Sequence, residues 1–446
     1  MHSVEELTSK KIFSFWVPLS ATWLMMAAEV PFLSAIIARM INPEFNLAAF
    51  GVATSFAMIV EAPVILLMSA STALVKDIHS YIRLRNFSFV LNLLVTLMML
   101  LFIIPSIFYF VTINLVELPF GVAKLTHYAM TILIPWPAAI GYRRFYQGIL
   151  IRNNLTRKVA YGTVVRLSSM ALTGLALHFF TNVDGSVVGA GALSTGVTCE
   201  AAASRLMAWK VVKKIKFGKI TSGENSNLTY NQIFKFYMPL ALTSVVSLGV
   251  QPMVTFFIGQ SRMAIESLAV LPVINSFVFI FRSVGLSFQE VGIALIGKNK
   301  EGYLPLRKFA FLLGITIVSL LGIIALTPLA NFWFNNISGL SIGLTNFSRL
   351  PLIIMILIPG LAVLLSFEIA VLVETKNTKP ITFSTVVEFT TIIIVMFVSI
   401  KLLNCVGAVA ASLGFLAGMI GANTYLFPPF IKSVKLEKIH SESSNC

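Results

Sequence analysis

Charged residues are scarce in this chain of 446 residues. Asp, Glu, Lys and Arg together make up only 11% of it, whereas charged residues account for roughly 25% of a soluble domain. Hydrophobic residues make up 57%, and the mean hydropathy is +0.88. This composition excludes an ordinary water-soluble globular protein and indicates a protein whose solvent is the lipid bilayer.

Cysteine is rare, and the common catalytic motifs are missing. Cys199, Cys405 and Cys446 are far apart and lack metal-ligand spacing, which argues against a disulfide framework or a zinc site. The sequence has no GxxxxGKS or GxxxxGKT phosphate loop, no HExxH and no GxSxG with triad partners. We therefore expect neither an enzyme nor a bound cofactor or metal.

Long apolar runs, by contrast, recur along the whole chain. A run of about 20 residues can cross the hydrocarbon core as a helix. The backbone must satisfy its own hydrogen bonds in lipid, and the unbroken hydrophobicity excludes the alternating pattern of a β-barrel. We expect an all-α polytopic membrane protein with about twelve transmembrane helices, near residues 12–40, 46–75, 87–111, 123–150, 158–180, 186–209, 231–259, 265–296, 306–330, 345–374, 380–402 and 405–431.

Basic residues are distributed unevenly among the polar gaps between these runs. The net charge is +15, and most of the 33 Lys and Arg residues fall in every second gap. Because cytoplasmic loops carry an excess of Lys and Arg, this pattern predicts a multi-pass protein of the plasma (inner) membrane with both termini in the cytoplasm.

The two halves of the chain repeat one another. Residues 12–19 (IFSFWVPL) align with residues 233–240 (IFKFYMPL), and the same offset superposes Pro31 on Pro252. We expect two pseudo-symmetric six-helix bundles, an N-lobe of residues 1–211 and a C-lobe of residues 231–446 with a short cytoplasmic tail, joined by a cytoplasmic linker of residues 212–230. Both copies then keep one orientation in the membrane, which places a substrate site between the lobes near the midplane. Six prolines in the spans are expected to kink their helices: Pro18, Pro31, Pro135, Pro239, Pro252 and Pro359.

This duplicated architecture resembles the multidrug/oligosaccharidyl-lipid/polysaccharide (MOP) exporter superfamily. Residues 147–150 (QGIL), followed by Arg152 and Thr156-Arg157, are similar to the end of the fourth helix in the multidrug and toxic compound extrusion (MATE) family, and residues 373–380 are a weaker equivalent in the second half. Residues 236–242 (FYMPLAL) also resemble a segment of the progressive ankylosis-like branch. The resemblance implies a MATE-like fold and a transporter that works by alternating access.

Ionisable residues recur inside the predicted spans, where each costs at least about 2.5–3.5 kcal/mol on insertion scales and normally faces a bundle interior or an aqueous cavity. At three equivalent positions of the repeat the sign of the charge is inverted. Glu61 corresponds to Arg282, Arg144 to Glu368, and Arg166 to Glu388. The other ionisable residues in the spans are Glu29, Arg143, Glu200, Arg205 and Glu290.

Two interpretations of these charges stay open. In the first, each lobe closes its own pairs, Glu61 with Arg144 or Arg166, and Arg282 with Glu368 or Glu388. A buried pair of this kind is only weak evidence for stability, but losing one partner leaves a costly lone charge.

In the second interpretation, the charges line a central cavity that suits an anionic or zwitterionic solute or a phosphate-bearing head group. Its walls are Arg143, Arg144, Gln147 and Arg166 from the N-lobe and Glu368 and Glu388 from the C-lobe. Adjacent arginines on a helix point about 100° apart, so Arg143 and Arg144 do not easily share one partner, which favours binding. A wider network of buried charges contains Glu200, Arg205, Arg282 and Glu290.

Glu29 and Glu61 are the candidates for ion coupling. Glu29 lies beside Pro31 in the first span, where its protonation can change as hydration changes during alternating access. Structural hydrogen bonding and direct substrate contact are the alternative roles for Glu29. Because the sequence has no nucleotide site, uphill transport would depend on a gradient of H⁺ or Na⁺.

The leading hypothesis is a secondary active transporter, an antiporter for the efflux of an organic solute. The alternatives are a flippase for a lipid or lipid-linked sugar, and a non-transporting membrane scaffold or lipid-processing enzyme. The expected partners are the bilayer and a small-molecule or lipid substrate. No nucleic acid is expected, because the basic residues are not gathered with aromatic ones in one domain, and we expect a monomer.

Overall fold

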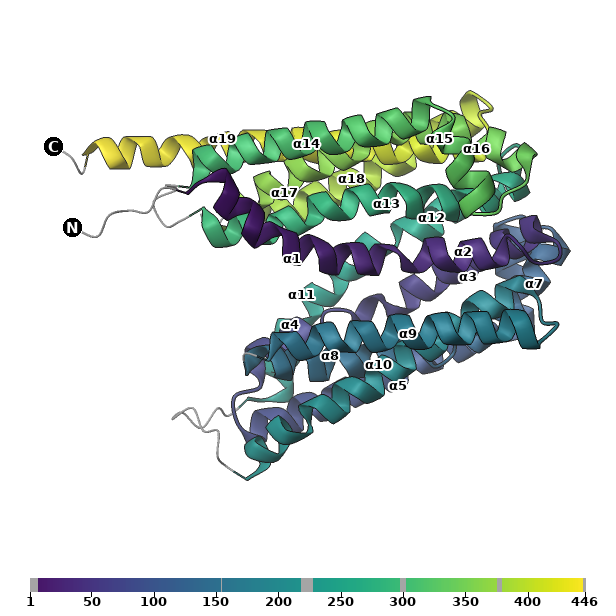
Figure 1. Cartoon of the computed structure of the whole chain (residues 1–446). Helices are drawn as coiled ribbons and strands as arrows, with labels where there is room; N and C mark the ends of the chain where they lie inside the picture. Colours follow the sequence, from purple (N-terminus) through teal and green to yellow (C-terminus); the bar gives the residue numbers. More distant parts are fainter. Residues whose placement is uncertain (1–6, 154, 218–227, 297–301, 375–378, 444–446) are drawn as a thin grey trace. The chain divides into compact units, whose positions relative to one another are not determined.

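The computed structural model describes residues 7–153, 155–217, 228–296, 302–374 and 379–443 (Figure 1). Within these ranges nearly all of the chain is helical. In the first half the helices are α1 (Ser9–Ala27), α2 (Glu29–Ile37), α3 (Pro43–Glu61), η1 (Ala62–Val64), α4 (Leu67–Leu74), α5 (Ile78–Ile103), α6 (Pro105–Tyr109), η2 (Phe110–Leu115), α7 (Phe120–Ile132), α8 (Trp136–Arg152), α9 (Thr156–Phe180) and α10 (Gly185–Lys216). In the second half they are α11 (Tyr230–Leu248), α12 (Val250–Gly259), α13 (Ala264–Leu295), α14 (Tyr303–Leu326), α15 (Leu329–Asn331), η3 (Phe332–Ile337), α16 (Ile342–Ile354), η4 (Met355–Leu357), α17 (Ile358–Glu374), α18 (Lys379–Phe397), η5 (Val398–Leu402) and α19 (Gly407–Ser443).

Each predicted span coincides with one long helix or with shorter helices that follow one another closely. In the described part of the chain, nine helical segments are both long and apolar enough to cross a membrane. The segments formed by α7 with α8, by α10, and by α11 with α12 fall outside that set. α10, for example, is 32 residues long but rich in glycine, serine and threonine in its first half. The expected all-α polytopic membrane protein is therefore confirmed.

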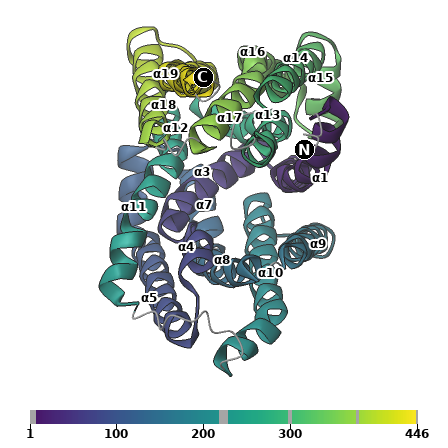
Figure 2. The same cartoon turned by 90° about the vertical axis from the view of Figure 1, so that its left-hand side faces the viewer.

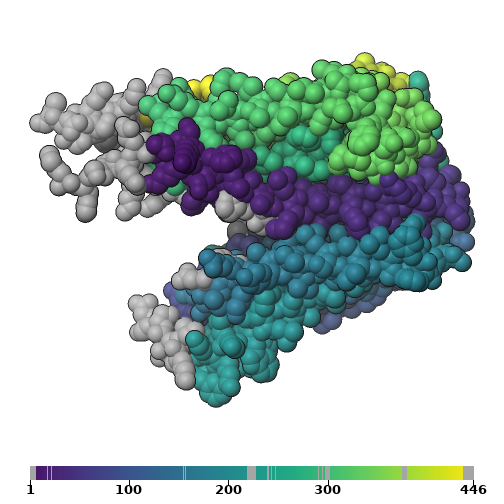
Figure 3. Space-filling model, in the orientation of Figure 1, coloured from purple at the N-terminus to yellow at the C-terminus, as the bar shows by residue number. Residues whose placement is uncertain are grey.

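The outer surfaces of the helices are rich in large apolar side chains. On α9 and α14, both visible in Figure 3, the side chains of Leu172, Phe179, Phe311 and Leu312 are 69%, 71%, 72% and 65% exposed. In water such surfaces would aggregate, whereas in a bilayer they face lipid tails.

The first helix of each half is broken at the same place. α1 ends at Ala27 and α2 begins at Glu29, because Pro31 lacks the N–H that would bond to the carbonyl of Ala27. In the second half α11 ends at Leu248 and α12 begins at Val250, and Pro252 removes the equivalent hydrogen bond. The repeat seen in the sequence therefore extends to the backbone.

The fourth span of each half is also interrupted at its proline. Residues 133–135 separate α7 from α8, and Pro135 is the last of them. In the second half the 3-10 helix η4 separates α16 from α17, and Pro359 is the second residue of α17. The kinks expected at these prolines are present, whereas Pro18 and Pro239 lie within α1 and α11 without ending them.

Contacts divide the chain into two units. The first unit consists of Met1–Phe32, Ser261–Met263 and Val270–Cys446, and the second of Leu33–Gln260 and Ala264–Ala269. In the first unit α1 packs with helices of the second sequence half. The Trp16 indole donates a 2.8 Å hydrogen bond to Ser287 Oγ on α13, and Ile12 is buried in a core with Phe288 and Val371.

The second unit shows the reciprocal arrangement, in which α11 packs with helices of the first half. Ile233 is buried in a core with Tyr81 and Phe145. The Tyr237 hydroxyl donates a 2.6 Å hydrogen bond to the Pro63 carbonyl. By its contacts, α1 of the first half therefore belongs with helices of the second half, and α11 of the second half belongs with helices of the first half. The lobe boundaries at 211 and 231 stay a prediction, and residues 218–227 of the predicted linker lie outside the described residues.

Within the first unit, the beginnings of α1 and α14 and the end of α19 lie at one end of the helices (Figure 1). A Cβ atom placed on Gly302, just before α14, would lie 3.0 Å from the Leu7 side chain, just before α1. The basic residues Lys11, Arg307 and Lys432 belong to these three segments. This is the end of the unit for which the sequence predicts the cytoplasm.

Candidate functional site

Glycines stand where helices of the second unit cross closely. α10 contacts both α8 and α9 (Figure 2). A Cβ atom placed on Gly196 of α10 would lie 3.1 Å from the backbone oxygen of Arg166 on α9. One placed on Gly148 of α8 would lie 2.3 Å from the backbone oxygen of Met68 on α4. These close approaches allow polar side chains on three different helices to meet inside the unit.

Glu200 on α10 lies at the centre of this group of polar side chains. Its side chain is fully buried, and its Oε2 accepts a hydrogen bond from Arg143 Nη1 on α8. Its Oε1 accepts a 3.0 Å hydrogen bond from Gln147 Nε2, one helical turn further along α8. Arg166 Nε on α9 lies 3.6 Å from Oε2. One carboxylate therefore joins two guanidinium groups and an amide at membrane depth.

Arg144 points to a different part of the unit from its neighbour Arg143. Its Nη1 contacts Met68 Sδ at 3.7 Å, and a thioether is a weak acceptor. No carboxylate among the described residues lies within ion-pair distance of Arg144. Its guanidinium thus keeps most of its five donors available, which distinguishes it from the paired Arg143.

Glu61, the last residue of α3, adds a second carboxylate to this region. It is buried and interacts electrostatically with Arg143, Arg144 and Arg166, but its Oε2 has no hydrogen-bond partner among the described residues. We call the following six residues the arginine cluster: Glu61, Arg143, Arg144, Gln147, Arg166 and Glu200. With three guanidinium groups and two carboxylates, the ionised cluster has one excess positive charge.

The arrangement differs from the pairing expected from the sequence, in which Glu61 took Arg144 or Arg166. The ion pairs are instead made by Glu200, with Arg143 and Arg166. The repeats do not single out Glu200, because with Gly189-Ala190 aligned on Gly407-Ala408 the residue opposite Glu200 is Gly418, which has no charge to compare. The spacing of Arg143 and Gln147, four residues apart on one helical face, was the available signal for a shared partner.

The second-half residues that correspond to the cluster belong to the first unit and have other surroundings. Glu368 on α17 is fully buried, and neither of its carboxylate oxygens has a hydrogen-bond partner in the part of the chain that the structure describes. Arg282 on α13 interacts electrostatically with Glu388 on α18. These three residues therefore do not gather around a shared acid as the arginine cluster does.

The other residues singled out in the sequence are Glu29, Arg205 and Glu290. Glu29 is half-buried and is the first residue of α2, directly after the break in the first span. The Arg205 guanidinium lies over the rings of Tyr146 and Trp209, at 5.1 and 5.2 Å. Glu290 is on α13, and its side chain lies outside the described residues. Among the residues described, no group of three or more His, Cys, Asp or Glu could hold a metal ion.

Comparisons with known proteins bear on the fold. No model of a protein family matches the chain, and no curated protein matches it by sequence. Solved structures do match over nearly the whole chain. An inward-facing multidrug resistance MATE family transporter of the MOP superfamily has a TM-score of 0.72 at 14% identity, covering 94% of this chain and 98% of that one. The lipid II flippase MurJ, in an inward closed conformation, has a TM-score of 0.69 at 16% identity, covering 95% and 91%.

An outward-facing MATE family transporter of the MOP superfamily is also similar, with a TM-score of 0.65 at 16% identity and 97% coverage of both chains. The chain therefore has the MATE-like fold that the sequence resemblance implied. The structures it resembles are described as transporters and a flippase.

Proposed function

We propose that the chain is a secondary active transporter that exports an organic solute with an anionic or zwitterionic group by alternating access. The observation that carries this proposal is Arg144, a guanidinium without a carboxylate partner among the described residues of a chain with a MATE-like fold. Ionisable residues inside membrane segments are expensive and mark sites for substrates or ions. A carboxylate or phosphate on the solute would supply an anionic partner for Arg144.

The chemistry of the arginine cluster assigns different tasks to its members. Glu200 pairs with and orients Arg143 and Arg166, so these two arginines stiffen the site rather than bind the solute alone. Arg144 presents a planar fork of donors that matches two oxygens of a carboxylate or phosphate. The surroundings have a lower dielectric constant than water, which strengthens this contact.

Coupling to a gradient of H⁺ or Na⁺ is the second part of the proposal. Glu61 and Glu29 are the coupling residues. Glu61 interacts electrostatically with the three arginines, so occupation of Arg144 by an anion and binding of a cation near Glu61 would influence each other. We also propose that Glu368 and Glu388 complete a central cavity between two lobes, in a monomer of the plasma membrane with both termini in the cytoplasm.

The decisive experiment is transport by the purified protein in proteoliposomes, with a panel of anionic metabolites, organic cations and fluorescent lipids and with H⁺ and Na⁺ gradients varied separately. Arg144→Ala should abolish transport of the anionic substrate, and Arg144→Lys should restore only part of it because lysine lacks the planar fork. Arg157→Gln, which removes an exposed arginine at the start of α9, is the control and should transport normally. Full transport by Arg144→Ala would refute the role of the cluster in binding.

A flippase for a lipid or lipid-linked sugar is the second candidate. Its support is the likeness to MurJ, named as a lipid II flippase, over 95% of this chain, together with an arginine cluster that suits a phosphate-bearing head group. Movement of a fluorescent anionic lipid across the bilayer, without uptake of any water-soluble anion, would select this function. Absence of movement for every compound in the panel would instead favour a non-transporting scaffold.

A further inference from the structure

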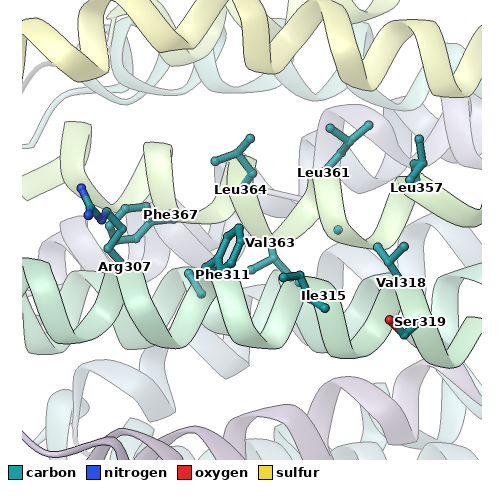
Figure 4. A pocket seen from close by; sticks show the side chains of 13 residues that line it. Arg307, Phe311, Ile315, Val318, Ser319, Leu357, Leu361, Val363, Leu364 and Phe367 are labelled. Atoms are coloured by element: carbon teal, nitrogen blue, oxygen red, sulfur yellow. The ribbon is translucent and has the colours of Figure 1, made fainter.

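A groove of about 440 Å³ lies between α14 and α17 of the first unit. Figure 4 shows that α14 supplies one wall and α17 most of the other, with Arg307 and Phe367 at one end and Ser319 at the opposite end. Apart from Arg307 and Ser319, every residue that lines the groove is apolar or glycine. All residues that line the groove belong to the first unit, whereas those of the arginine cluster belong to the second.

Gly314 on α14 leaves space between the helices. A Cβ atom placed on Gly314 would meet no atom closer than 3.9 Å, and the nearest one is the backbone oxygen of Gly360 on α17. The groove therefore exists because no side chain at position 314 fills it. Large apolar side chains line the groove beside this glycine, including Phe311 and Leu364, which are 72% and 42% exposed.

The dimensions of the groove match one half of a bilayer. From Arg307 to Ser319 the groove follows α14 for about 18 Å, at about 1.5 Å per residue. The hydrocarbon core of a membrane is about 30 Å thick, so one leaflet is about 15 Å deep. The volume would hold roughly fifteen groups of water size, which is the scale of one acyl chain.

Arg307 gives the apolar groove a charged end. It is exposed near the beginning of α14, a helix long and apolar enough to span the membrane, and it has no hydrogen bond or ion pair with another described residue. An arginine at such a position extends its guanidinium toward the head groups while its stem covers apolar surface. A phosphate at this level can take two hydrogen bonds from the guanidinium.

We propose that the groove between α14 and α17 binds one acyl chain of an anionic phospholipid, whose phosphate group pairs with Arg307. Any lipid can cover the apolar walls, but only a lipid with net negative charge compensates the charge of the guanidinium. The cytoplasmic leaflet is rich in anionic lipids, and the beginning of α14 lies at the end of the unit for which the sequence predicts the cytoplasm. The proposal does not depend on the transported substrate.

Native mass spectrometry of the delipidated full-length protein tests this site, with phosphatidylglycerol and phosphatidylcholine of identical acyl chains as probes. The unaltered protein should retain phosphatidylglycerol about fivefold more strongly, because both lipids carry a phosphate but only phosphatidylglycerol has a net negative charge near Arg307. Arg307→Gln should remove this preference and leave weak binding of both lipids. Lys308→Gln is the matched control, because Lys308 is equally basic and exposed but does not line the groove.

A second pair of variants tests the apolar space of the groove independently of the charge of Arg307. Gly314→Leu should fill the space and reduce retention of both lipids, and leucine is a better helix former than glycine, so folding should persist. Gly322→Leu, on the same helix but outside the groove, should bind lipid normally. Equal retention of the two lipids by the unaltered protein, an equal loss in Lys308→Gln, or undiminished binding in Gly314→Leu would each overturn the proposal.

Discussion

Replacing Glu200 by leucine should destabilise the protein more than any other single substitution in the arginine cluster. The change leaves Arg143 and Arg166 buried without their carboxylate and removes the acceptor of Gln147. At 3.6 Å and an effective dielectric constant of about 20, the Glu200–Arg166 attraction alone is about 4.6 kcal/mol before desolvation is counted. Breaking a buried pair typically costs about 3–5 kcal/mol, and we expect Glu200→Leu to lose at least that much.

The comparison with Arg143→Met makes the prediction specific. That substitution removes only one of two cations, and Glu200 retains Arg166 and Gln147, so the loss should be smaller, about 1–3 kcal/mol. The double variant should lose less than the sum of the two single losses, because Arg143→Met then removes a cation that has already lost its carboxylate. Denaturant titration of the purified protein in detergent micelles measures the three free energies of unfolding.

Two results would refute this reasoning. If Glu200→Leu costs no more than Arg143→Met, Glu200 is not the shared partner of two cations. If the losses in the double variant are strictly additive, the two side chains act independently. An Arg157→Gln variant, altered at an exposed arginine, should leave the free energy of unfolding within about 0.5 kcal/mol of the unaltered value.

The packing of the helices can be tested in the same way. Gly148→Val should greatly reduce the yield of folded protein in size-exclusion chromatography, because its Cβ would lie 1.8 Å from Ser71 Oγ and 2.3 Å from a backbone oxygen, whereas Gly343→Ala, with no atom within 4 Å of the added carbon, should be tolerated. A valine variant that elutes normally would contradict the close helix crossing at this glycine. Trp16→Phe should lower the free energy of unfolding by about 1 kcal/mol, because the 2.8 Å hydrogen bond to Ser287 is lost, and an unchanged value would contradict the packing of α1 on α13.

Much of the fold was predictable because its signals are local. Hydropathy located the helical segments, because each span must form the hydrogen bonds of its own backbone in lipid. Pro31 and Pro252 predicted the breaks that separate α1 from α2 and α11 from α12, because a missing N–H acts within one helical turn. The exchange of α1 and α11 between the halves was not predictable, since it depends on contacts such as Trp16 with Ser287, far apart in the chain.

The candidate site was predictable in its members but not in its connections. The divergence of Arg143 and Arg144 follows from the helical rotation per residue, and the structure places them against Glu200 and Met68 respectively. That Glu200 contacts residues of both α8 and α9 depends on how closely α10 approaches those helices, as at Gly196. Such a distance is a property of three packed helices and cannot be read from any one of them.

The position of Glu200 on the last helix of the first half has a consequence for biosynthesis. A ribosome completes α8 and α9 before α10, so Arg143 and Arg166 are made before the acid that pairs with them. Until α10 is inserted, the nascent chain holds these arginines without Glu200 in helices that belong in the membrane, which is costly. We therefore expect the insertion machinery to hold the two earlier helices until α10 is inserted, because only then can Glu200 pair with their arginines.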